Sequence, residues 1–304
     1  MDVPAVSLIL EELIDKADPL GMENIMEKQA GKRTGRQTGK QTESHEKNQD
    51  KSILVLQAAR IIMGLAFIVL LGLLGYHLYE YWQGDRIYSD IRQTAVPEDT
   101  QDIAGADDAA EPAGEEGIID FEALRRINPD CVAWICGCDD GIDYPVVLSQ
   151  DDTYYLTHTI TGESNKAGSI FVDQYAEAPF AQFQTILYGH NMKNGSMFHA
   201  LLDYRDKEYW EDHKTITVYL AGETKEYRIF AAYYSYYEEL PVYDSMETMK
   251  EREAYIDRIE ALSLYDTAVE VTAADQILTL ITCEYSGEDY RMVVHAAEDL
   301  EQDE

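Results

Sequence analysis

The chain has 304 residues, and its 24 Lys and Arg residues are outnumbered by 58 Asp and Glu residues, which gives a formal net charge of -34. The first 60 residues hold nine of the basic and ten of the acidic side chains, so 15 basic and 48 acidic side chains follow residue 60. No basic stripe that could neutralise phosphates is present there, so nucleic acid is not a predicted partner. A hydrophobic content of 45% with 22 Tyr predicts a folded core and excludes a disordered acidic chain.

Residues 1–60 are predicted to form a largely disordered, basic cytoplasmic tail. The stretch 28–52 is rich in Gly, Thr, Gln and charged residues and has no hydrophobic periodicity.

Residues 61–79 read IIMGLAFIVLLGLLGYHLY and contain no Asp, Glu, Lys or Arg. Such a run is long enough to cross a bilayer as a helix. Basic residues from Lys28 to Arg60 precede it and acidic residues follow it, so the positive-inside rule places the N-terminus in the cytoplasm and the remainder outside the cell. The run ends in bulky aromatic residues instead of a cleavage site, which predicts an uncleaved, single-pass signal anchor in the cell membrane.

Residues 80–117 are predicted to be a juxtamembrane segment and an acidic linker, because 97–119 is rich in Asp, Glu, Ala, Gly and Pro. Residues 118–304 are then expected to form one exported globular domain.

Eight runs rich in β-branched and aromatic residues predict strands in this domain. They cover 131–137, 143–148, 168–173, 184–190, 215–220, 225–236, 276–283 and 290–297. Helices are predicted at 121–128, 197–204 and 246–262, and the last is an insertion before the final two strands. The expected fold class is therefore mainly β, an eight-stranded barrel with peripheral helices and this helical insertion, preceded by one transmembrane helix.

Cys283 ends the apolar strand run TLITC, and the chain returns through Arg291 into RMVVHA. If these two strands form an antiparallel pair, Cys283 and Arg291 face each other at the mouth of the hairpin. A guanidinium beside a thiol favours the thiolate, and it can also hold a developing oxyanion.

His190 closes another strand run, ILYGH, between Gly189 and Asn191, which both permit a tight turn at a strand end. A histidine there can take a proton from a thiol or protonate a leaving amine. His199 and His295 lie within a helix and a strand, and are expected to be packed side chains.

Cys131, Cys136 and Cys138 fall within eight residues on one predicted strand, where alternation puts Cys131 on the opposite face, so no metal site is expected. We expect buried thiols, with a disulfide as the alternative outside the membrane. The paired acids at 139–140 and 151–152 match no calcium-loop pattern and are expected to be solvated.

The motifs together resemble those of the sortase family. YGHNMKNGSMFHALLDY (188–204), AGSIFVD (167–173), DDTYYLTH (151–158) and the TLITC/RMVVHA hairpin resemble class B sortases, and the resemblance covers about 118–297.

This resemblance implies a membrane-anchored cysteine transpeptidase that needs no metal and no other cofactor. Its partners would be the sorting-signal peptide of secreted surface proteins and an amine of the peptidoglycan precursor or of a pilin. Carried over by position, Cys283 is the nucleophile, His190 the general acid and base, and Arg291 the anchor for substrate and oxyanion.

Further residues are expected near the substrate. Thr282, Ser286, Tyr290 and Asn191 are candidates for peptide contacts, and the segments 174–183 and 238–266 are expected to shape the groove. Glu284 and Asp289 both remain candidates for an acid that orients the site.

Three alternatives remain open from the sequence. A thiol peptidase would use the same residues with water as acceptor, a pilin-polymerising enzyme would differ only in its acceptor, and a non-enzymatic surface binding module would not need Cys283.

Overall fold

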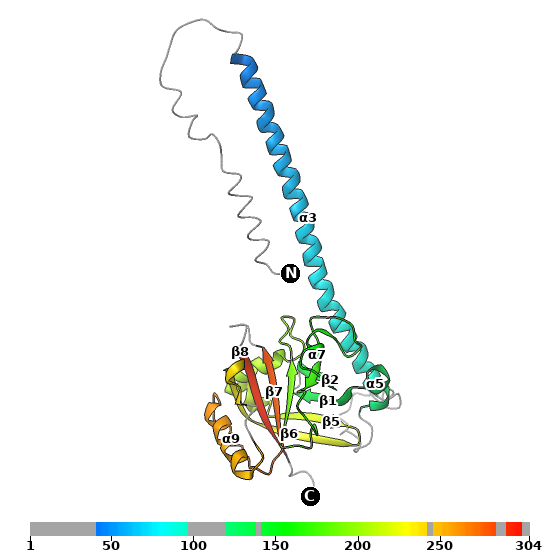
Figure 1. Cartoon of the computed structure of the whole chain (residues 1–304), viewed down its shortest axis with the longest axis vertical. Helices are drawn as coiled ribbons and strands as arrows, with labels where there is room; N and C mark the ends of the chain where they lie inside the picture. Colours follow the sequence, from blue (N-terminus) through cyan, green and yellow to red (C-terminus); the bar gives the residue numbers. More distant parts are fainter. Residues whose placement is uncertain (1–40, 97–118, 138–140, 242–245, 284–289, 300–304) are drawn as a thin grey trace. The chain divides into compact units, whose positions relative to one another are not determined.

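The computed structural model describes residues 41–96, 119–137, 141–241, 246–283 and 290–299 (Figure 1). The chain divides into two compact units, one up to Leu70 and one from Leu71 onward.

Helix α3 spans Gln41–Ala95, and its part Val55–Ala95 is long and apolar enough to cross a membrane. Residues 41–60 were predicted to be disordered but are helical. The physical reason is that their Gln, Glu, Lys and Ala residues are good helix formers, and they extend a helix that the apolar run already nucleates.

The second unit is a closed barrel in the strand order β1-β2-β3-β4-β7-β8-β6-β5. All eight predicted strands are present, with ends that differ from the prediction by at most two residues. They are β1 (Cys131–Gly137), β2 (Ile142–Leu148), β3 (Ile170–Val172), β4 (Gln184–Gly189), β5 (Thr215–Leu220), β6 (Glu223–Tyr236), β7 (Ile277–Cys283) and β8 (Tyr290–Glu298). Neighbouring strands are antiparallel except for the pairs β2–β3 and β4–β7.

Strand β7 is apolar on both faces because both faces are covered. Leu278 and Leu280 point into the main barrel core, while Ile277 and Ile281 belong to a second cluster with helix α9 (Met249–Leu262). Alternation along the strand therefore places positions 277, 279, 281 and 283 on the outer face of the barrel.

Helix α9 is the predicted insertion, and it starts three residues later than expected because Thr248 and Glu251 form a capping box. Tyr255, Ile256 and Ile259 are buried as the periodicity predicts, whereas Met249 in the first turn is exposed.

The remaining short helices lie around the barrel. Two of them match predicted helices, α5 (Phe121–Ile127) and the 3-10 helix η2 (His199–Arg205), whereas α7 (Tyr154–Thr157), α8 (Lys207–Asp212) and η3 (Tyr237–Glu239) were not predicted.

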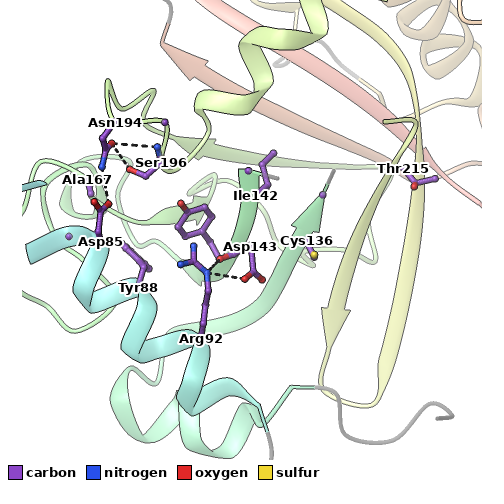
Figure 2. Close-up of a pocket in the computed structure, with 15 residues that line it drawn as sticks. Asp85, Tyr88, Arg92, Cys136, Ile142, Asp143, Ala167, Asn194, Ser196 and Thr215 are labelled. Atoms are coloured by element: carbon purple, nitrogen blue, oxygen red, sulfur yellow. Dashed lines mark hydrogen bonds and ion pairs between the residues drawn. The ribbon is translucent and has the colours of Figure 1, made fainter. Parts of the chain in front are cut away.

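The end of α3 is part of the barrel unit. Tyr88, Ile91 and Ala95 are buried in the core, and the Tyr88 hydroxyl donates to the carbonyl of Gly168. Figure 2 shows this end of the helix beside the barrel, with Arg92 bridged to Asp143 at 2.9 Å. The compact unit therefore begins upstream of the boundary predicted at residue 118.

The acidic segment does not join the anchor to the domain, as the predicted linker would. The Asp120 amide donates to the Ala95 carbonyl at 2.8 Å, so the chain leaves and re-enters the barrel unit at one place. Residues 97–118 themselves lie outside the described part of the chain.

Candidate active site

Three strand ends meet at the candidate site. Cys283 at the end of β7 pairs in register with Arg291 in β8, as the predicted hairpin requires. The parallel pair β4–β7 runs in register up to Gly189 and Thr282, so the next positions are 190 and 283. Positions 190, 283 and 291 thus lie on three neighbouring strands on the outer face of the barrel. The side chain of Cys283 lies outside the described part of the structure.

A pocket of about 190 Å³ lies at these strand ends. It is lined by Asp152, Leu156, Phe171, Tyr188, Gly189, His190, Ile281, Thr282 and Arg291. His190 and Arg291 therefore open into one cavity.

His190 is held by a backbone carbonyl of α7. Its Nε2 lies 2.7 Å from the Leu156 oxygen, and because a carbonyl only accepts, Nε2 carries the proton and Nδ1 is the basic nitrogen. Burial lowers the pKa of His190 and the nearby Arg291 cation lowers it further, although the Leu156 hydrogen bond opposes both effects. The neutral ring, which can accept a proton, is thereby favoured near pH 7.

Arg291 lines the pocket, and its Nη1 donates to the Tyr290 carbonyl at 3.2 Å. The strand register places this permanent cation beside position 283. A negative charge that develops on a sulfur or an acyl oxygen at that position would be stabilised by the guanidinium.

Thr282 also lines the pocket and is only 1% exposed. Its hydroxyl has no hydrogen-bond partner among the residues that the structure describes. A buried hydroxyl without a partner costs free energy, so a ligand atom that bonds to it gains affinity.

Asn191 and Tyr290, two other predicted substrate residues, are not among the described residues that line this pocket. The Asn191 side-chain oxygen lies 2.7 Å from His199 Nδ1, which ties Asn191 to η2. The Tyr290 ring stacks on Tyr234 with a centroid distance of 5.4 Å and meets Tyr236 edge-on. Ser286, Glu284 and Asp289 fall outside the described residues.

Sequence reasoning missed most of the pocket wall. Tyr188 could have been found, because it lies two residues before His190 on the same face of β4. Asp152 and Leu156 come from α7 and the turn before it, where four helical residues give no periodic signal. Asp152 was expected to be solvated, but it accepts hydrogen bonds from the backbone and side chain of Gln174 at 2.9 and 3.0 Å. Burial raises its pKa, and the charge of Asp173 adds to this effect.

His295 is the packed side chain that its strand position predicts. It is fully buried between the Tyr233 hydroxyl at 3.0 Å and the Thr279 hydroxyl at 2.9 Å, and burial lowers its pKa to about 3.

Of the clustered cysteines, Cys131 is buried and Cys136 is partly exposed, while Cys138 lies outside the described residues. Burial raises the pKa of Cys131 to about 12, which leaves that thiol protonated and unreactive.

Comparisons with known proteins agree with this geometry. Residues 141–299 match the family model described as the sortase domain. Sortase B of Listeria monocytogenes is 34% identical over 226 residues, which cover 73% of this chain and 91% of the relative. The chain belongs to the class B sortases.

Solved class B sortases have the same fold. The X-ray structure of Clostridium perfringens sortase B gives a TM-score of 0.56 at 32% identity and covers 59% of this chain and all of that one. The Staphylococcus aureus sortase B–substrate complex gives a TM-score of 0.62 at 28% identity over 73% of this chain and 98% of that one.

Sortases are transpeptidases with a cysteine active site, and the matched sortase domain contains every residue that lines the pocket. Strand β1 and the end of α3 lie upstream of the match, although they belong to the same compact unit.

Proposed function

We propose that this sortase is a membrane-anchored enzyme that cleaves the C-terminal sorting signal of surface proteins and transfers them to an amine of the peptidoglycan precursor. The observation that carries the proposal is the meeting of positions 190, 283 and 291 at three adjacent strand ends beside one pocket.

In the first step, the Cys283 sulfur attacks the carbonyl carbon of the scissile peptide bond while His190 Nδ1 takes the thiol proton. Arg291 stabilises the oxyanion that forms on the carbonyl oxygen. The intermediate then collapses, the C–N bond breaks, and His190 returns the proton to the leaving amine, which leaves a thioester on Cys283.

In the second step, the acceptor amine attacks the thioester carbon and loses a proton to His190. The C–S bond breaks and His190 returns the proton to the sulfur, which restores the thiol of Cys283. The low pKa of His190 supports this cycle because the ring must be neutral to take each proton.

The pocket is proposed to bind the sorting-signal peptide. The buried hydroxyl of Thr282, for which no described residue is a hydrogen-bond partner, supports a peptide contact there. Ser286, and Glu284 or Asp289 as an orienting acid, remain candidates in the segment between β7 and β8. Asn191 and Tyr290 are weaker candidates because neither lines the pocket.

We also propose that α3 is the membrane anchor, with a cytoplasmic N-terminus and an extracellular catalytic unit. Its apolar part and the basic residues before it support this orientation.

The test uses the full chain in detergent with fluorescence-quenched peptides that carry sorting-type motifs, with and without an amine acceptor such as triglycine. Wild type is compared with Cys283→Ala and with Cys136→Ala, which removes a thiol outside the pocket. We expect mass spectrometry to find a thioester adduct in wild type and Cys136→Ala, and ligated product only when the amine is present.

Equal cleavage by Cys283→Ala and wild type would overturn the cysteine mechanism. An adduct that yields only hydrolysed peptide at every amine concentration would indicate a thiol peptidase. Ligation to a pilin lysine in preference to triglycine would indicate a pilin-polymerising enzyme.

A further inference from the structure

The end of the apolar run in α3 lies directly against one loop of the barrel. Lys166 Nζ lies 2.6 Å from the Glu80 carboxylate and 2.8 Å from His77 Nδ1. Asn165 donates to the Glu80 carbonyl at 3.0 Å, and Gln83 donates to Glu163 at 2.9 Å. Residues 163–166 of this loop therefore lie beside residues 77–83 of the helix.

The position of the loop along the helix is fixed, because further contacts hold the next turns of the helix against the barrel. Asp85 accepts from Asn194 at 2.8 Å and Arg92 bridges to Asp143 (Figure 2). Tyr88 and Ile91 are buried. From residue 77 to residue 95 the contacts span about 27 Å of helix at 1.5 Å per residue.

Upstream of these contacts the helix is apolar, and no other described residue covers it: Leu71, Leu74 and Tyr76 are each more than half exposed. Tyr79 and Trp82, beside the contacts, are more than half exposed as well. Tyr and Trp side chains of this kind gather at the boundary between hydrocarbon and headgroups. The helix rises only about 6 Å over the four steps from Tyr79 to Gln83, which is close to the thickness of one headgroup layer.

The same loop is joined to the wall of the catalytic pocket. His158 forms a β-bridge with Ser164, and it follows α7, whose Leu156 lines the pocket and bonds to His190. The Tyr154 ring stacks on His158 at a centroid distance of 4.2 Å. Only a few residues thus separate the pocket wall from the loop at the end of the apolar helix.

The charge of this segment also differs from that of the exported unit. Residues 153–169 contain one acidic residue, Glu163, and one basic residue, Lys166, with no further Asp, Glu, Lys or Arg. The rest of the exported chain is strongly acidic and would be repelled by anionic lipids.

We propose that residues 153–166, together with Trp82, form a membrane-docking face that lies in the phospholipid headgroup layer of the bilayer that holds α3. The catalytic pocket then opens at the membrane surface. It would favour peptides whose scissile bond is held there by a membrane-embedded segment. This inference rests on the proposed anchoring by α3.

The test places the photo-crosslinker p-benzoylphenylalanine in the full chain, in lipid nanodiscs that contain phosphatidylglycerol. In separate variants, this crosslinker replaces Thr161 or Tyr154 on the docking face, Leu74 in the apolar helix, or Leu264 as a matched control. Thr161, Tyr154 and Leu264 are all exposed, but Leu264 lies beyond the end of α9. Thermal unfolding identifies the variants that keep the fold.

We expect lipid adducts at positions 74, 154 and 161, with yields at 154 and 161 at least fivefold above that at 264. Adducts at 74 with yields at both 154 and 161 no higher than at 264 would overturn the docking face and leave the anchoring intact. A lack of adducts at 74 would overturn the anchoring, and the docking face with it.

Discussion

The charge of Arg291 influences the pKa of His190, because both side chains line the same pocket. Burial is the larger cause of the low pKa of His190, and the Arg291 charge adds to it. In Arg291→Met the cation is lost, so we expect the pKa of His190 to rise toward its ordinary value of about 6.5.

NMR titration of the His190 ring in the full chain would measure this shift. Arg228→Met is the matched control, because Arg228 pairs with Asp299 at 3.0 Å, near the end of β8 remote from the pocket, and should leave the titration unchanged. An unchanged or lower pKa in Arg291→Met would contradict the prediction.

His295 links stability to pH. Its pKa falls from about 6.5 in the unfolded chain to about 3 in the folded one, so protons bind preferentially to the unfolded state. Its contribution to stability is therefore complete above pH 6.5 and is lost as pH falls through the window down to about 3, by up to about 1.4 kcal/mol per pH unit.

Urea unfolding of wild type and His295→Gln at several pH values isolates this effect, because the carboxylates are common to both. We expect the His295→Gln variant to be less stable than wild type at pH 7, since Gln forms the hydrogen bonds to the Tyr233 and Thr279 hydroxyls less well. On acidification the variant should lose less stability than wild type. Parallel pH profiles would disprove the linkage.

At the scale of elements, the end of α3 contributes to the stability of the barrel. A chain that starts at residue 118 lacks the buried side chains of Tyr88 and Ile91, whereas one that starts at residue 80 keeps them. Burial of one large side chain is worth about 1.5 to 3 kcal/mol, so we expect the shorter chain to be less stable by roughly 3 kcal/mol or more.

Urea unfolding of the two truncated chains measures the difference. The chain that starts at residue 80 with Tyr88→Ala and Ile91→Ala is the control for the packing itself and should resemble the shorter chain. Equal stability of all three would show that the helix end does not stabilise the barrel.

The acidic segment 97–118 begins and ends at one place, since Ala95 and Asp120 are hydrogen-bonded. Replacing residues 98–117 with four Gly and Ser residues shortens a closed loop, so we expect equal or higher stability. A melting temperature several degrees lower than that of wild type would indicate that the segment makes stabilising contacts.

These elements also show where sequence reasoning succeeds. The eight strands were predictable because each is rich in β-branched and aromatic residues and is bounded by turns or polar residues. The hairpin of β7 and β8 brought Cys283 and Arg291 together from topology alone. Tyr81, Tyr88, Ile91 and Ala95 recur at helical spacing, so the packed end of α3 was also readable, although the adjacent acidic segment suggested a linker. The positions of Asp152 and Leu156 could not be predicted from the sequence, because only closure of the barrel brings these residues close to His190.

At the scale of the whole molecule, α3 sets the distance between bilayer and pocket if the docking face is correct. Eight Gly and Ser residues inserted after Tyr79 would uncouple the two and leave the packed turns from Glu80 onward in place. We expect at least fivefold slower cleavage of a substrate embedded in vesicles by a hydrophobic segment, and unchanged cleavage of the same motif as a soluble peptide.

The same insertion within 97–118 is the control and should alter neither rate, because that segment does not separate the anchor from the barrel. Equal loss with both substrates would mean that the insertion damages the catalytic unit. Equal rates with both substrates would contradict positioning by the helix.

The parallel pairing of β4 with β7 has a consequence for how the enzyme acquires its activity. His190 and Cys283 belong to segments far apart in the sequence, and non-local parallel pairs form late because a long loop must close before any contact is gained. In the proposed mechanism, Cys283 therefore gains His190 as its base only once β4 and β7 have paired. Before that pairing the thiol would have ordinary reactivity, so folding itself would delay the proposed acyl transfer.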